Sequence, residues 1–217
     1  MEGKSGDCGQ RPLPAAGGVR ELPLPLPGGV AALLQAKAPG FEPVAFALCE
    51  TLWLRDPETG AHGQRVGKLA LELCHELRLS PEESRIIGLG AVLHDIGKIG
   101  IPDSILHKPA PLDARKWNVM RGHVAYGRRL LQGLVDTDEI QMLIYQHHER
   151  MDGQGYPNGL TRSELSLGTR LVTLVDAYDA MSSRRPYRAP LSHDEAIDEL
   201  YRNAGKQFDL DLVVCHS

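Results

Sequence analysis

The chain has 217 residues, enough for one domain of ordinary size; 42% of them are hydrophobic and only 5% are aromatic. Because aromatic and β-branched runs are scarce, this composition favours helices packed on helices over a sheet-based core. The net charge of −4 at pH 7 offers no basic surface for a nucleic-acid groove, so we expect no DNA partner.

Features that would mark a secreted or membrane protein are missing from the sequence pattern. No run approaches the roughly 20 apolar residues of a membrane span, and the N-terminus lacks the apolar stretch of a signal peptide. The cysteines follow neither metal-finger spacing nor a disulfide framework; they are Cys8, Cys49, Cys74 and Cys215. We therefore predict a cytoplasmic protein with reduced thiols and no membrane segment.

The first 40 residues differ in composition from the rest. They are rich in Gly, Pro and Ala, and Leu alternates with Pro in the stretch that begins at Leu22. Alternating prolines exclude a helix and favour an extended, polyproline-like conformation. We expect a disordered or loosely attached leader here, with a docking peptide as the alternative, followed by one folded domain over residues 41–217.

Apolar spacing predicts an all-α bundle of about seven helices. The first begins near Glu42 and ends at the Arg55-Asp56-Pro57 break, and the second runs from about Gly60 to Leu77. Ser80 and Glu83 form a predicted capping box, with Pro81 at the first helical position, and so open the third helix. This third helix leads into the adjacent pair His94-Asp95.

The second half of the chain continues the helical pattern without a confident strand. Residues 101–112 contain three prolines and predict a loop, after which Asp113 caps a helix through about Leu134. Another helix starts at Thr137 or Asp138 and ends at His147-His148. Residues 151–160 must form an ordered loop, because three glycines and a proline exclude a helix. Helices over 167–181 and from Ser192, with a second capping box to Glu195, complete the prediction.

The stretch Gly90–Asp103, GAVLHDIGKIGIPD, carries the clearest chemical signal. His94 and Asp95 supply the imidazole and carboxylate that a catalytic divalent metal prefers. Gly97 suits a left-handed residue that ends a helix, which would place both ligands at a rim. Lys98 then stands close enough to meet an anion. Alone, this pair would be better read as a buried histidine beside a surface aspartate.

Other histidines and carboxylates also fall near predicted helix ends, which suggests one buried centre. A cluster of imidazole and carboxylate without thiolate suits iron or manganese, with zinc as an alternative. One carboxylate can bridge two ions about 3.5–4 Å apart, and such a pair can clamp an in-line phosphoryl displacement. Each residue has a structural alternative as a cap, a helix histidine or a buried ion pair. The candidates are Glu58, His62, His94, Asp95, His123, His147, His148 and Asp176.

Three motifs together resemble the HD-GYP branch of the HD phosphohydrolase superfamily. They are HDIGKIGIPD, His123 with Gly127, and HHERMDGQGYP, and the resemblance covers roughly residues 42–212. It implies an all-helical HD-domain bundle with a buried di- or tri-metal site in a catalytic domain over residues 41–217. It also implies hydrolysis of the bacterial second messenger cyclic di-GMP to linear pGpG or on to GMP.

The resemblance assigns roles residue by residue. It implies two or three divalent ions, most often iron, with manganese as the alternative. The implied metal ligands are His62, His94, Asp95, His123, His147, His148 and Asp176, and Glu58 stands where trinuclear members add a glutamate. Asp95 and Lys98 are the implied catalytic residues. The implied substrate contacts are Arg185, Arg188, Tyr156 and Asp56. For Tyr156 a structural role, in which it anchors its own loop, is an equally good alternative.

Departures from the family pattern leave other readings open. Gly63 follows His62 where the family usually has Ser, which is expected to loosen a contact behind the metal ligand. The tail FDLDLVVCHS differs from the usual FDP and a longer final helix.

The nearest rival function is the same chemistry on cyclic GMP-AMP. A rival from another class is a non-catalytic module that binds cyclic di-GMP or a diguanylate cyclase (GGDEF) partner.

Overall fold

The computed structural model of the chain describes residues 40–183 and 189–215, and this part is helical, as predicted. No strand occurs among these residues, which form only two isolated β-bridges outside the helices. The helices are α2 (Glu42–Arg55), α3 (Pro57–Glu76), α4 (Pro81–Leu93), α5 (Asp103–Leu106), α6 (Ala114–Arg121), α7 (His123–Leu131), α8 (Asp138–Gln146), α9 (Leu167–Ser182), α10 (His193–Arg202) and α11 (Leu210–Cys215), with 3-10 turns η1 (Ile96–Gly100) and η2 (Arg162–Glu164). Residues 1–39 of the predicted leader lie outside the described part.

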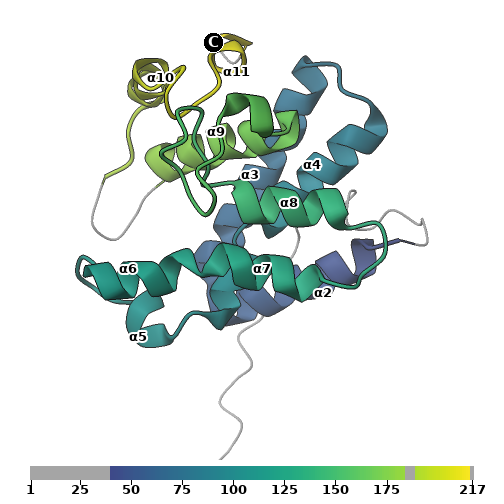
Figure 1. Ribbon diagram of the computed structural model, residues 1–217, viewed down its shortest axis with the longest axis vertical. Coiled ribbons are helices and arrows are strands. Elements are labelled where there is room, and N and C mark those ends of the chain that lie inside the picture. Colours follow the sequence, from purple (N-terminus) through teal and green to yellow (C-terminus); the bar gives the residue numbers. More distant parts are fainter. Residues whose placement is uncertain (1–39, 184–188, 216–217) are drawn as a thin grey trace, which may run out of the picture.

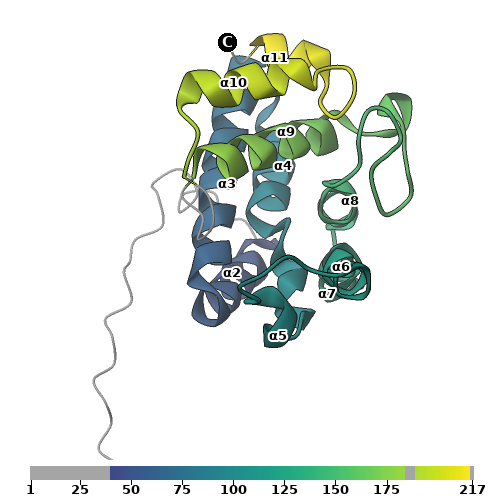
Figure 2. The same ribbon diagram turned by 90° about the vertical axis from the view of Figure 1, so that its left-hand side faces the viewer.

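The helices pack around two hydrophobic clusters that α4 joins. One cluster lies among α3, α4, α9 and the C-terminal helices and includes Leu171, Leu174 and Leu200. The other lies among α2, α4, α7 and α8 and includes Leu93 and Ile144. In Figures 1 and 2, α10 and α11 cover α9 at one end of the bundle, while α5 and α6 lie at the other end. The end of α4 therefore sits in the middle of the molecule.

The helix starts follow the capping signals of the sequence, with one correction. The second helix begins at Pro57 rather than near Gly60, because the Asp56 carboxylate accepts a hydrogen bond from the Glu58 amide and Pro57 suits the first position. Glu58 and His62 consequently share one helix. The capping boxes at Ser80 and Ser192 are both present, and Asp113 caps α6, as predicted.

The helix predicted over 113–134 is in fact two helices, α6 and α7. The Gly122 amide bonds the carbonyl of Val119, three residues back, and this tightened turn interrupts the α-helical ladder. His123 thus opens α7 instead of lying inside a longer helix. The chain also adds a single turn, α5, within the loop predicted over 101–112, and a short α11 after the last predicted helix.

Gly97 has a different role from the predicted one. It lies inside η1 and does not adopt the left-handed conformation, which is found instead at Gly133 and three other glycines. A Cβ atom at Gly97 would lie 1.8 Å from the carbonyl oxygen of His123 and 2.4 Å from the amide nitrogen of Gly127. Glycine is therefore required because the backbone of η1 touches the backbone of α7.

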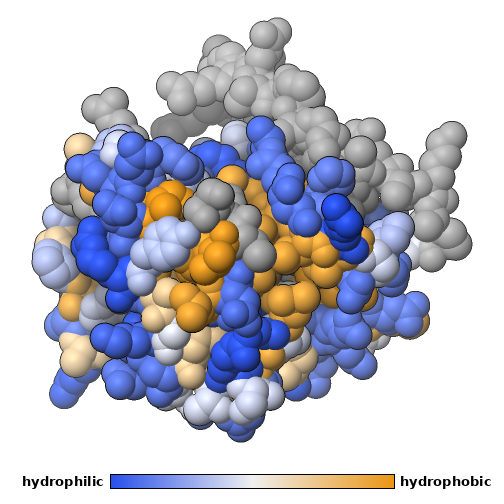
Figure 3. Space-filling model, turned by 90° about the horizontal axis from the view of Figure 1, so that it is seen from above, coloured by the Kyte–Doolittle hydropathy of each residue, from blue (hydrophilic) through white to orange (hydrophobic). Residues whose placement is uncertain are grey.

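The surface shows one apolar face. Seen from the end that carries α10 and α11, hydrophobic residues gather in the middle and hydrophilic residues surround them (Figure 3). Leu210 and Val214 of α11 are 52% and 55% exposed. None of the described helices has the length and apolar content needed to cross a membrane.

Candidate metal centre

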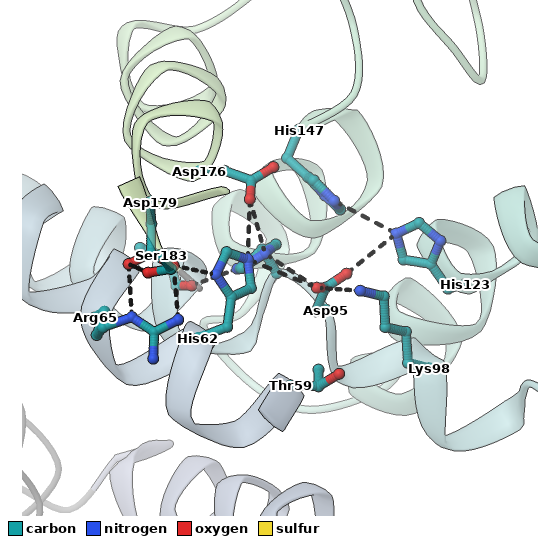
Figure 4. A network of polar contacts seen from close by, with 12 residues as sticks. Thr59, His62, Arg65, Asp95, Lys98, His123, His147, Asp176, Asp179 and Ser183 are labelled. Carbon is teal, nitrogen blue, oxygen red and sulfur yellow. Dashed lines mark hydrogen bonds and ion pairs between the residues drawn. The ribbon is translucent and has the colours of Figure 1, made fainter. Parts of the chain in front are cut away.

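Seven of the predicted metal ligands converge in the middle of the bundle, and we call this group the metal centre. Figure 4 labels five of them, His62, Asp95, His123, His147 and Asp176. Its side chains come from five places in the chain: the second turn of α3, the end of α4, the start of α7, the end of α8 and the middle of α9. Most of them are buried. The metal centre consists of His62, His94, Asp95, His123, His147, His148 and Asp176.

The metal centre divides into two triplets. The donor atoms of His62, His94 and Asp176 lie within 4.8 Å of one another, and so do those of a second triplet, His123, His147 and His148. A third overlapping group joins His94 and His147 through Asp95. Two neighbouring positions for a divalent ion follow from this arrangement.

Asp95 lies between the two triplets. One of its carboxylate oxygens, Oδ2, is 3.4 Å from Nε2 of His94, and the other, Oδ1, is 3.4 Å from Nε2 of His123. The residue is 3% exposed. Lys98 places its Nζ atom 2.6 Å from Oδ2. Since each oxygen faces a different triplet, Asp95 has the geometry of a carboxylate that bridges two ions.

Three of the imidazoles are held in the form that binds metal. In His94, His123 and His147 the Nδ1 atom lies 2.7, 2.7 and 2.8 Å from the backbone carbonyl oxygen three residues earlier. Donation from Nδ1 leaves Nε2 unprotonated and directed into the centre. Nε2 of His94 is buried and has no hydrogen-bond partner among the residues that the structure describes. Because an unpaired buried acceptor costs about 1–3 kcal/mol, this atom fits a cation ligand.

His62 is held by a carboxylate instead of a carbonyl. Its Nδ1 atom lies 2.7 Å from Oδ2 of Asp179, and Arg65 donates two hydrogen bonds to that carboxylate, at 2.7 and 2.8 Å. Asp179 is 3% exposed. Asp179 and Arg65 were not predicted from the sequence. The available signal was spacing, since each follows a metal-centre residue by three positions, one helical turn.

The ionisation states suit metal binding with one exception. Burial and the neighbouring imidazoles lower the pKa of His147 well below its usual range, and burial lowers the pKa of His148 to about 4. Burial favours the neutral form of Asp95, but Lys98 and His94 outweigh it and hold its pKa well below the usual value. Burial likewise opposes the charge on His62, yet hydrogen bonds to Asp176 and Asp179 raise its pKa to about 9. A metal ion must therefore displace a proton from His62.

The loop over residues 151–160, here called the GYP loop, is ordered as predicted. The side chain of Glu149 holds this loop through hydrogen bonds to its backbone. This carboxylate is fully buried and accepts hydrogen bonds from the amides of Asn158 at 2.7 Å and Leu160 at 3.0 Å. The Tyr156 ring stacks on His148 with 4.7 Å between centroids and 28° between planes. The loop is thus packed directly on a metal-centre residue. The role of Glu149 was not predicted from the sequence.

The remaining predicted site residues lie around this centre or outside the described part. Glu58 is exposed, one turn before His62, and belongs to neither triplet, so its metal role stays a prediction. Asp56 uses both oxygens to cap α3, accepting from the Glu58 amide and the Thr59 hydroxyl, and its substrate contact also stays a prediction. Two predicted phosphate contacts, Arg185 and Arg188, lie outside the described residues.

Gly63 provides a close contact between helices. A Cβ atom there would lie 2.7 Å from the carbonyl oxygen of Val92, so the absence of a side chain lets α3 approach α4 beside the metal centre. The loosened contact behind His62 that we expect from the departure from Ser stays a prediction.

Comparison with known proteins gives a consistent family assignment. The family model described as HD domain matches residues 47–212. The chain is 42% identical over 164 residues to the cyclic di-GMP phosphodiesterase response regulator RpfG of Xanthomonas campestris, a match that covers 75% of this chain and 43% of the relative. It is 36% identical over 178 residues to the 3′3′-cGAMP-specific phosphodiesterase 2 of Vibrio cholerae, covering 78% of this chain and 33% of the relative.

A solved structure supports the same fold. The crystal structure of a cyclic GMP-AMP specific phosphodiesterase of Vibrio cholerae superposes with a TM-score of 0.59 at 17% identity, covering 79% of this chain and 46% of that chain. The chain thus spans less than half the length of each of these three relatives.

Proposed function

The chain belongs to the HD domain family, and from this premise we propose that it is a metal-dependent phosphodiesterase. Its proposed reaction is hydrolysis of cyclic di-GMP to linear pGpG or GMP in bacterial second-messenger signalling. The observation that carries the proposal is Asp95, whose two oxygens face the two ligand triplets. Two ions clamped in this way suit attack of water on a phosphodiester.

The proposed cofactors are two divalent ions, iron or manganese, with a third ion if Glu58 contributes. The donor set supports this choice, because it is rich in imidazole and carboxylate and contains no thiolate. When bound, such ions supply an activated water nucleophile and a Lewis-acid charge for the phosphoryl group.

The chain's own residues would then bind and orient the substrate. Lys98 lies at the rim with about a quarter of its side chain exposed, so its ammonium group can reach a phosphate and stabilise charge on the departing 3′-oxygen. Arg185 and Arg188 are proposed to hold the phosphate that does not react, because guanidinium groups pair with phosphate oxygens through two hydrogen bonds. Tyr156 is proposed to line the same opening.

The choice of substrate has one specific competitor. One relative is named for cyclic di-GMP and another for 3′3′-cGAMP, at similar identities, so cyclic GMP-AMP is the second candidate. A non-catalytic module is less favoured, because the seven predicted ligands lie in groups that could hold a metal ion. The GYP loop is proposed as a docking point for a diguanylate cyclase partner carrying a GGDEF domain. A cytoplasmic location accords with a second-messenger substrate.

The test uses protein purified without oxygen and loaded with iron or manganese. Metals per chain are counted, cyclic di-GMP or 3′3′-cGAMP is added, and products are separated by chromatography. We expect two or three metals and the appearance of pGpG or GMP. Hydrolysis of 3′3′-cGAMP alone would change the proposed substrate to cyclic GMP-AMP. A metal-loaded protein that hydrolyses neither dinucleotide would overturn the proposal. Asp95→Ala should lose both metal and turnover; normal turnover would contradict the site.

A further inference from the structure

Arg121 occupies an unusual place beside the metal centre. It is the last residue of α6, two positions before His123, and its guanidinium carbon lies 4.9 Å from the centre of the Tyr156 ring. The same ring stacks on His148 with 4.7 Å between centroids. The Tyr156 ring therefore contacts both an exposed arginine and a metal-centre histidine.

The charge of Arg121 is not neutralised within the described part of the chain. Other cations near the centre have carboxylate partners: Lys98 pairs with Asp95, and Arg65 pairs with Asp179. For Arg121 no ion pair with a carboxylate is found among residues 40–183 and 189–215; its contact is the Tyr156 ring. A guanidinium that lies over a ring without a carboxylate partner has N–H groups that can donate to an anion.

We infer that Arg121 and Tyr156 form an anion-binding site at the edge of the metal centre, and that this site takes a phosphate of the dinucleotide substrate. The inference rests on the proposed function. A cyclic dinucleotide carries two phosphates, and only one can lie on the ions while it reacts. The arginine over the ring can donate to the other phosphate in addition to the contacts proposed above, and because it belongs to neither ligand triplet its effect is expected on KM.

The chain contains a matched control for this arrangement. Arg128 is also exposed and stacks on a tyrosine, with its guanidinium carbon 5.0 Å from the centre of the Tyr145 ring. Tyr145 precedes His147 by two positions, which turns it about 200° around α8, away from the metal centre. Arg128 thus reproduces the charge and the stacking of Arg121 without the neighbouring ligands.

The experiment compares Arg121→Gln, Arg121→Lys and Arg128→Gln in the metal-loaded protein, with cyclic di-GMP as substrate. For Arg121→Gln we expect KM to rise about tenfold or more, with kcat within about twofold, unchanged metal content and a weaker dependence of KM on salt. Arg121→Lys should recover part of the loss, since it keeps the charge but not the planar stack. Arg128→Gln should leave KM unchanged.

Two outcomes would overturn the site while leaving the proposed function in place. One is an Arg121→Gln protein whose KM lies within twofold of the wild type. The other is a joint loss of kcat and metal content, which would mean that Arg121 only supports Tyr156 and the loop. If the wild type hydrolyses no cyclic dinucleotide, equilibrium binding of a slowly hydrolysed phosphorothioate analogue of cyclic di-GMP replaces KM. If the wild type binds the analogue and Arg121→Gln binds it more weakly, the anion site is supported although the proposed function is not. If the two proteins bind it equally, or neither binds it, the anion site is overturned.

Discussion

His62 and Asp179 are 117 residues apart in the chain, yet their side chains meet at 2.7 Å, between Nδ1 and Oδ2. This contact joins α3 to α9 directly behind the metal centre. It also gives His62 a different support from the other buried imidazoles, each of which donates to the backbone carbonyl three residues earlier. A side chain can be removed by substitution, whereas a carbonyl cannot, so this contact is open to experiment.

Asp179→Asn should weaken metal binding about 10–100-fold, because the partner that orients His62 loses its charge and Arg65 loses its ion pair. Metal titration followed by mass spectrometry of bound metal would measure the change. Glu199→Gln, at a surface ion pair with Arg202, serves as the control and should bind metal normally. Equal affinities in the two variants would show that Asp179 has no role in positioning His62.

Glu149→Ala should destabilise the protein by about 2 kcal/mol, since it leaves the amides of Asn158 and Leu160 without their acceptor. We expect a lower midpoint in urea unfolding and faster proteolytic cleavage within the GYP loop. Glu164→Ala removes an exposed capping carboxylate in the same region and should cost about 1 kcal/mol or less. A cleavage rate that matches the wild type would contradict the role given to Glu149.

Gly97→Ala should cost more than 3 kcal/mol and reduce the metal content, because the added Cβ would lie 1.8 Å from the His123 carbonyl oxygen and push η1 away from α7. Gly133→Ala provides the comparison. That glycine has φ +85° but no heavy atom within 4 Å of an added Cβ. It should cost only about 1–2 kcal/mol of backbone strain and leave metal binding intact. Chemical denaturation and metal analysis would separate the two effects.

Lys98→Met should lower kcat about a hundredfold or more while the protein still binds its metals, because the ammonium group lies beside Asp95 but belongs to neither ligand triplet. Steady-state kinetics with metal analysis of the same sample would test this. A variant that turns over normally would remove Lys98 from the catalytic residues, and one that loses its metals would assign it a structural role.

The metal-free protein should lose stability as the pH rises from about 7 to 9. The folded state holds the pKa of His62 at about 9, above the ordinary value of 6.5, so it binds more protons than the unfolded chain in this window. The stabilisation that protonated His62 provides is complete below pH 6.5. About 2 kcal/mol of it is lost between pH 7 and 8.5. Urea unfolding after chelation would measure it, and His62→Gln should flatten the profile. A flat profile in the wild type would contradict the raised pKa.

Local signals in the sequence were enough for most helix starts. Ser80 with Glu83, Ser192 with Glu195, and Asp113 all cap helices as predicted, because a cap involves only residues three or four positions apart. A family resemblance of unusual specificity also predicted which seven side chains come together in the metal centre.

What the sequence could not predict depends on contacts between distant segments. The need for glycine at position 97 arises where η1 touches α7. The contact of Asp179 with His62 depends on the packing of α9 against α3. The contact of Arg121 with Tyr156 depends on where the GYP loop lies relative to the end of α6. No periodicity or spacing rule encodes which loop will cover which helix.

The metal centre gathers its ligands from α3, α4, α7, α8 and α9, so a bound ion would act as a cross-link between nearly all parts of the fold. An ion present at a hundred times its dissociation constant adds about 2.7 kcal/mol to the free energy of unfolding, a substantial share of the stability of a domain this size. Metal supply would then govern how long the protein survives proteases as well as how fast it turns over substrate. If the proposed function is right, starving a cell of the ion would remove the protein, and its cyclic dinucleotide substrate would persist after the metal returned until new chains had been made.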